Sequence, residues 1–184
     1  MIKIESLLNV KSANNYEISP ITMAVLSTVS SDGQQGAIVL EESQEYQVPV
    51  TPTKMVDSAC VLYGSSLRGR LDGTRGISQI THKAPIAIDP ASGIYFFPTM
   101  SPKHKQCSWI SHSHVKHIEA ENNNSQTTVH FRNGQMITID VSFGIMLNQQ
   151  HRTAQFRYAL NLRMQQMHGK RKPKNHDFDG FFNS

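Results

Sequence analysis

The sequence contains few cysteines and lacks any long apolar run. Cys60 and Cys107 are its two cysteines. They are too few for a disulfide framework and form no C-x-x-C pair, so we expect free thiols. Apolar segments such as GIYFFPTM and GIMLN fall far short of the ~20 residues that a membrane span needs, and the first residues show no apolar h-region of a signal peptide. These absences predict a cytoplasmic protein without a membrane partner.

Several motifs that mark enzymes are also missing. The chain has no Walker loop, no G-x-G-x-x-G fingerprint, no G-x-S-x-G elbow and no H-E-x-x-H pair, and it contains no internal repeat. The sequence therefore gives no support to the nucleotide-dependent and hydrolytic classes that these motifs mark.

Positive charge is concentrated after residue 59. Residues 1–59 carry three Lys/Arg against seven Asp/Glu, residues 60–118 carry seven against two, and residues 119–184 carry eight against five, which gives −4, +5 and +3. A positive potential on one part of a soluble protein favours nucleic acid or another polyanion as its partner.

Alternating apolar and polar residues predict several strands. The alternation runs through residues 16–29 and 36–50, and IAIDPASGIYFFPT predicts a hairpin whose turn contains Pro90 and Gly93.

A second hairpin spans TTVHFRNGQMITIDV. For this hairpin we predict a three-residue loop over residues 132–134 with Gly134 left-handed, because a two-residue Asn-Gly loop would split the apolar side chains between two faces. The three-residue loop places five of them on one face: Val129, Phe131, Ile137, Ile139 and Val141.

Two segments show helical periodicity. Around residues 53–63, Thr51 can cap a helix, Pro52 suits its first position, and Gly64 suits the left-handed residue after its end. One face of this short helix collects Met55, Val56, Ala59, Cys60 and Tyr63. A longer helix over residues 144–167 places Phe156, Leu160, Met164 and Met167 on one stripe.

The segment SSLRGRLDGTRG, residues 65–76, alternates three arginines with three glycines and offers little apolar surface for burial. We expect a loop there, with at most one helical turn. Because no second short helix is predicted beside residues 53–63, a helix-turn-helix is not expected. The predicted fold class is α+β: a β-rich, mostly antiparallel sheet or partly closed barrel with one short internal helix and a longer C-terminal helix.

One cysteine and three histidines gather in CSWISHSHVKH, residues 107–117. If residues 109–120 form one strand, His112 and His114 share a face and could bind zinc together with Cys107, which would make a zinc-dependent enzyme. Lys116 would lie on the same face, where its charge opposes a divalent cation, so we favour an ordinary strand and expect no metal. A further alternative is a module for RNA or single strands that stacks bases on Tyr95 and Phe97.

Several longer segments resemble one known family. ACVLYGSSLRGRLDGT, ITHKAPIAIDP, IYFFPTMSPKHKQCSWISHSHVKH, VHFRNGQ and QHRTAQFR occur in the same order as the corresponding segments of ComK, the competence transcription factor of Bacillus and related Gram-positive bacteria. The resemblance covers about residues 16–163. We accordingly expect a flexible N-terminal arm at residues 1–15, a single ComK-like DNA-binding domain at residues 16–168, and a basic tail at residues 169–184 that is disordered in isolation.

The resemblance implies a transcription activator of genes for DNA uptake and recombination, acting at the bacterial nucleoid without a cofactor or enzymatic activity. Such a protein binds A/T-rich promoter DNA mainly through the minor groove, as a homodimer or higher homo-oligomer. RNA polymerase and an adaptor that delivers the protein to a Clp protease are further candidate partners. The tail GKRKPKNHDFDGFFNS has no convincing counterpart of the segment that the adaptor grips, which puts regulated degradation in doubt.

Charge and spacing give the candidate DNA-binding residues. The narrow minor groove of A/T-rich DNA has an enhanced negative potential that attracts inserted arginines. Arg68, Arg70 and Arg75 lie among glycines, which let the backbone come close to a partner. Contacts to phosphates, which set register without reading sequence, are expected from Lys83, Lys103, Lys105, Lys116, Ser65 and Ser66.

Overall fold

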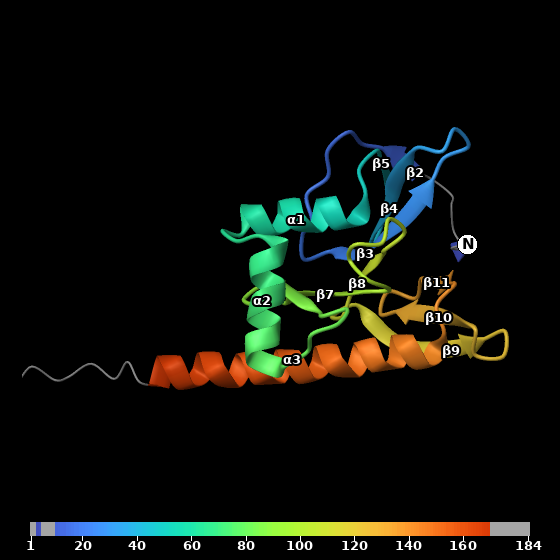
Figure 1. Cartoon of the computed structure of the whole chain (residues 1–184). Coiled ribbons are helices and arrows are strands. Elements are labelled where there is room, and N and C mark those ends of the chain that lie inside the picture. The colour runs from blue at the N-terminus through green and yellow to red at the C-terminus, as the bar shows by residue number, and fades with distance from the viewer. Residues whose placement is uncertain (1–2, 5–9, 170–184) are drawn as a thin grey trace, which may run out of the picture.

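The computed structural model describes residues 3–4 and 10–169, and the statements below refer to them. The expected basic tail lies outside the described residues from residue 170 onwards. Within the expected N-terminal arm, residues 3–4 and 10–12 each pair with a sheet. Figure 1 shows the elements in chain order: β1 Lys3–Ile4, β2 Val10–Ser12, β3 Thr22–Val29, β4 Gln35–Glu41, β5 Glu45–Val48, α1 Pro52–Leu62, α2 Leu67–Ser78, β6 Ile86–Asp89, β7 Ile94–Pro98, β8 Trp109–Ser111, β9 Val115–Glu121, β10 Gln126–Phe131, β11 Met136–Ile139 and α3 Phe143–Gly169.

The strands form two open sheets. One has seven strands in the order β2-β5-β4-β3-β8-β7-β6, and the other has four in the order β1-β11-β10-β9. Every pair is antiparallel except β2 with β5. The predicted α+β class with a mostly antiparallel sheet is therefore confirmed. The alternative form, a partly closed barrel, is wrong, because neither sheet joins its two edges.

The seven-stranded sheet is the middle layer of the molecule. On one face, Val25, Val39 and Trp109 pack with Met55 and Val56 of α1. The opposite face contributes Leu26 and Ile110 to a second core, which the four-stranded sheet and Met146 of α3 complete. The middle strands are buried on both faces, which explains why TMAVL in β3 reads as a nearly continuous apolar run.

The hairpin predictions are confirmed. Gly93 has a left-handed φ of 74° in the turn between β6 and β7. Gly134 has φ of 91°, and Val129 pairs with Ile137, so the loop between β10 and β11 contains the three residues 132–134. All five apolar side chains assigned to this hairpin's inner face lie in or against the second core.

The helices are partly as predicted. α1 begins at Pro52 and is followed by Gly64 at φ 70°, while Thr51 occupies the N-cap position without a side-chain hydrogen bond. Its predicted apolar face is buried, except that Tyr63 is exposed. α3 is the long C-terminal helix, and its C-terminal half extends past α2 (Figure 1). None of the described helices is long and apolar enough to cross a bilayer.

Two predictions about local structure are wrong. Residues 65–76 were expected as a loop, but residues 67–78 form helix α2, so the described chain has two short internal helices rather than one. α1 and α2 follow each other across residues 63–66, and α2 runs crosswise to α1 (Figure 1). The pair of short helices that a helix-turn-helix requires is therefore present. Residues 109–120 are also not one strand, because a turn over residues 112–114 separates β8 from β9.

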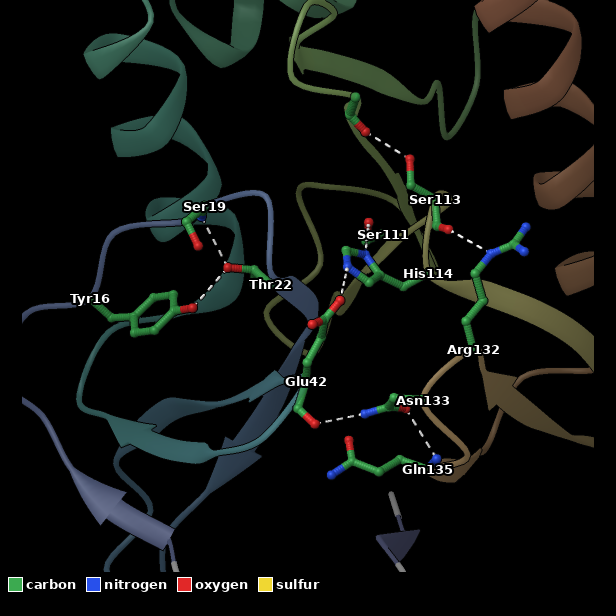
Figure 2. Close-up of polar contacts among 11 residues, drawn as sticks. Tyr16, Ser19, Thr22, Glu42, Ser111, Ser113, His114, Arg132, Asn133 and Gln135 are labelled. Atoms are coloured by element: carbon green, nitrogen blue, oxygen red, sulfur yellow. Dashed lines mark hydrogen bonds and ion pairs between the residues drawn. The ribbon is translucent and has the colours of Figure 1, made fainter.

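Polar contacts hold this turn between the two sheets (Figure 2). His114 Nδ1 and Ser111 Oγ share a hydrogen bond of 2.8 Å, and His114 Nε2 lies 3.6 Å from Glu42 Oε1. Arg132 donates to the backbone oxygen of Ser113 at 2.9 Å, and Asn133 donates to that of Glu42 at the same distance. The polar side chains of the turn are therefore occupied in joining the β10–β11 hairpin to the seven-stranded sheet.

Candidate nucleic-acid interface

Helix α2 forms although its sequence is rich in glycine, because other parts of the fold satisfy its ends and bury its inner face. Ser66 is the N-cap, and its hydroxyl accepts a hydrogen bond from Gly69 N at 3.1 Å. Asp57 of α1 accepts from Leu67 N at 2.8 Å. On the inner face, the buried Thr74 hydroxyl donates to the backbone oxygen of Pro85 at 2.8 Å. These contacts fix α2 against α1 and the strand that follows it.

The outer face of α2 is a strip of glycines. Gly69, Gly73 and Gly76 follow at helical spacing opposite the buried Leu67 and Thr74. A Cβ built on Gly73 or Gly76 would meet no atom within 4 Å. Each glycine in an exposed helix interior is about 1 kcal/mol less favourable than alanine. Within the described part of the chain, no neighbouring atom therefore requires these two residues to be glycine.

Arg68 and Arg75 border the glycine strip along one edge. The Arg68 side chain is 93% exposed, and its Nε lies 3.9 Å from an oxygen of Asp72. Arg75 Nη1 donates to Asp72 Oδ1 at 2.9 Å, while 49% of its side chain remains exposed. Surface ion pairs of this kind are weak, worth at most about 1 kcal/mol, so both guanidinium groups can exchange Asp72 for a stronger anion.

Arg70 is placed differently from the other two arginines. It is only partly exposed, and its Nη2 donates to the backbone oxygen of Tyr63 at 3.0 Å, at the C-terminal end of α1. A cation at this end of a helix complements the unsatisfied carbonyls. Arg70 therefore closes the turn between α1 and α2.

The remaining predicted site residues are spread over the surface. Ser65 is half-buried in the α1–α2 turn, and the half-buried Lys83 lies in the connection after α2, where its carbonyl accepts from Gln149 at 2.9 Å. Lys103 and Lys105 are exposed in the β7–β8 loop beside the start of α1, where Pro102 O accepts from Thr53. Lys116 is exposed on β9, a strand of the four-stranded sheet. The structure thus gathers Ser66, Arg68 and Arg75 on α2, with Ser65 and Arg70 at its base, and leaves the lysines apart.

The three residues of the alternative zinc enzyme do not form a ligand group. Cys107 is fully buried, and burial raises the pKa of its thiol to about 11, which disfavours a reactive thiolate. His112 Nδ1 lies 2.9 Å from Arg157 Nη1, and burial followed by the charge of Arg157 lowers its pKa to about 4. His114 is occupied by Ser111 and Glu42. A zinc centre on these residues is therefore not supported.

The single-strand-binding alternative required exposed aromatic rings on a sheet. Tyr95 and Phe97 are instead 2% and 1% exposed. Arg157 of α3 lies over the Tyr95 ring at 4.5 Å, and Phe156 packs against its edge. Neither ring can stack with a base, so this premise is wrong.

Sequence reasoning missed Asp57, an acidic residue that organises α2. Asp57 belongs to α1, and its carboxylate accepts a hydrogen bond from the backbone of α2. Asp72 pairs with two arginines. Asp72 carried a usable signal, because it lies four residues after Arg68 and three before Arg75, the spacings of neighbours on a helix.

The fold and this surface define an α+β protein with an exposed face of arginines and glycines on helix α2. The chain belongs to the ComK protein family, whose model matches residues 13–165. A relative in Bacillus subtilis (strain 168), described as a competence transcription factor, is 37% identical over 164 residues, which are 89% of this chain and 82% of the relative. No solved structure matches the chain.

Proposed function

We propose that the protein is a DNA-binding transcription activator of competence genes, which recognises A/T-rich promoter DNA at the bacterial nucleoid and acts as a homo-oligomer without enzymatic activity. Membership of the ComK family and the description of the relative support the transcriptional role. The observation that carries the DNA-binding assignment is the exposed strip of Gly69, Gly73 and Gly76 beside Arg68 and Arg75.

The dimensions of the grooves decide how α2 can approach DNA. A helix with side chains is about 10–12 Å wide and the minor groove only about 6 Å, so α2 as a whole stays outside that groove. Arginine side chains reach further than the helix surface, and the narrow groove of A/T-rich DNA attracts them. In this proposal Arg68 and Arg75 enter the minor groove, while the bare backbone at Gly73 and Gly76 lets the helix rest close to the sugar-phosphate rim.

The other basic residues act on phosphates in this proposal. Lys103 and Lys105 share an exposed loop near α1, and Ser65, Ser66 and Lys83 flank the two ends of α2. Lys116 belongs to β9 of the four-stranded sheet and not to α2 or its connections, so we assign it no contact with the stretch of duplex that α2 binds. It contributes where the DNA bends around the protein or where a second subunit binds.

Self-association is supported by exposed apolar side chains on the distal half of α3. Tyr158 is 71% exposed, Leu162 42% and Met167 65%, although all three belong to a helix whose first half is packed on the core. Exposed apolar side chains grouped on one element are typical of protein interaction sites. We assign this end of α3 to the contact between subunits.

A second binding mode is favoured by one observation, the α1–turn–α2 connectivity. In helix-turn-helix proteins the second helix lies in the major groove, which at about 12 Å admits a helix. Both modes place α2 on DNA and differ in the groove that is read.

Inosine substitution separates the two modes. An I·C pair presents a minor groove like that of A·T, because inosine lacks the N2 amino group, whereas its major groove resembles that of G·C. We expect duplexes in which A·T is replaced by I·C to bind as tightly as A/T-rich duplexes, with G·C duplexes weaker. If the I·C duplex binds like G·C while A·T binds tightly, α2 reads the major groove. Equal weak binding to all three would contradict the DNA-binding function itself.

A further inference from the structure

The outer face of the four-stranded sheet brings two histidines into direct contact. His117 of β9 lies opposite His130 of β10 in the antiparallel register, and their rings stack with centroids 4.2 Å apart and planes 10° from parallel. The pair continues the regular register of β9 and β10, and a bulge follows it: Phe131 lies opposite Val115, so Lys116 has no partner on β10.

A carboxylate completes the group. Glu119 follows His117 by two residues, so both point to the same side of β9. Its Oε1 lies 3.1 Å from His117 Nε2, and its Oε2 lies 3.3 Å from His130 Nε2. The Nε2 of His130 is buried, although the ring is partly exposed, and it faces Glu119 Oε2. The side-chain atoms that could bind an ion all lie within 4.8 Å of one another.

We propose that His117, Glu119 and His130 form a binding site for a divalent transition metal ion of the zinc class. Zinc bound to nitrogen or oxygen at about 2.0–2.2 Å in a tetrahedral site separates its ligand atoms by about 3.3 Å. The two carboxylate–imidazole distances of 3.1 and 3.3 Å match that spacing. The ion would also bind the buried Nε2 of His130 directly.

The chemistry of the three groups selects the class of ion. Imidazole nitrogens suit zinc and its neighbours in the first transition series, whereas magnesium and calcium prefer oxygen ligands throughout. Three protein ligands leave a fourth tetrahedral position for water or for a group of another molecule. His117 and Glu119 are exposed, so the ion exchanges with solvent.

The consequence for the fold is a link between β9 and β10. The ligands come from both strands at the bulge, next to Val115 and Phe131, which are buried in the second core. An ion that binds the folded sheet and not the unfolded chain stabilises the fold by mass action. This site lies outside α2 and does not depend on the proposed DNA-binding function.

Zinc titration of the purified full-length chain, without an affinity tag, tests the proposal. By calorimetry we expect one zinc per chain in the wild type. His117→Ala, His130→Ala and Glu119→Gln should each weaken zinc binding at least roughly tenfold, because each removes one of three ligands. The matched control is His151→Ala, which removes an exposed histidine of α3 and should leave zinc affinity unchanged. Magnesium in place of zinc should not bind.

Thermal unfolding gives a second readout. Zinc should raise the melting temperature of the wild type and of His151→Ala, and leave that of His130→Ala unchanged. Since His117 and Glu119 are exposed, their variants keep the core contacts and report on binding even if His130→Ala folds poorly. The proposal is overturned if the His117→Ala and Glu119→Gln variants bind zinc as the wild type does, or if His151→Ala loses as much affinity as they do.

Discussion

Asp72 and Arg75 form an ion pair on the exposed side of α2, with Arg75 Nη1 2.9 Å from Asp72 Oδ1. The other carboxylate oxygen lies 3.9 Å from Arg68 Nε. One acidic residue thus partly neutralises the two arginines that we assign to the groove. In the proposed complex the DNA phosphates neutralise Arg68 and Arg75 instead. Asp72 therefore competes with the DNA for these two arginines.

Replacing Asp72 by Asn should therefore tighten DNA binding. We expect a gain of roughly three- to tenfold in affinity at low salt, shrinking as salt is raised, because the effect is electrostatic. Folding stability should change by less than about 1 kcal/mol. Fluorescence anisotropy with an A/T-rich duplex at two salt concentrations measures the gain. Glu17→Gln makes the same charge change at an exposed position away from α2, and an equal gain in that variant would contradict the local explanation.

Replacing Gly73 or Gly76 by Ala should separate stability from binding. A Cβ at either position meets nothing inside the protein, so each change should stabilise the fold by about 0.5–1 kcal/mol. DNA affinity should nevertheless fall, because the added methyl groups hold the helix away from the duplex. Gly144→Ala, on open space at the start of α3, should leave binding unchanged. Urea unfolding and anisotropy together decide the point. Variants with unchanged affinity would show that the glycine strip is not in contact with DNA.

Polar substitution on the distal half of α3 should reduce self-association. Tyr158→Lys combined with Leu162→Lys removes two exposed apolar side chains, and we expect a smaller molecular mass in sedimentation equilibrium with a melting temperature close to that of the wild type. Gln155→Lys, an exposed position on the same helix, adds charge without removing apolar surface and serves as the control. If both variants sediment like the wild type, the subunit contact lies elsewhere.

The protein should lose stability on acidification partly through His112. Burial and the nearby Arg157 lower its pKa to about 4, below the value of an unfolded histidine near 6.5. Between these two values the unfolded chain binds more protons than the folded chain, so stability falls as pH drops through this window. Because the side chain is partly exposed, we expect the loss to be at most about 2 kcal/mol. His112→Gln should unfold with a shallower dependence on pH between 6.5 and 4, as measured by urea titration at each pH. An unchanged slope would contradict this assignment.

The sequence predicted the elements whose signals are local. The β10–β11 hairpin was predictable in register because only a loop ending at Gly134 puts Val129 and Ile137 on one face, and Gly134 has the left-handed φ that this loop needs. α1 was predictable because Pro52 and Gly64 mark its limits. In both cases the residues that determine the structure lie within a few positions of one another.

Helix α2 was not predictable in the same way. Glycine lowers its intrinsic helix propensity, and the contacts that stabilise it come from other segments: Asp57 of α1 binds its first turn, and Pro85 accepts from Thr74. The break between β8 and β9 had no glycine or proline to mark it, and depends on contacts such as His112 N to Tyr95 O. The His117–His130 pair depends on the register of β9 against β10, which no local sequence pattern indicates.

The most direct test of the central claim is a titration of A/T-rich and G/C-rich duplexes, at two salt concentrations, with the wild type and with an Arg68→Ala/Arg75→Ala double variant. Both side chains are exposed, so the variant should fold normally. We predict that it binds A/T-rich DNA more weakly, with a smaller salt dependence and a reduced preference over G/C-rich DNA. A double variant that keeps the affinity and the A/T preference of the wild type would contradict the assignment of α2 to DNA recognition.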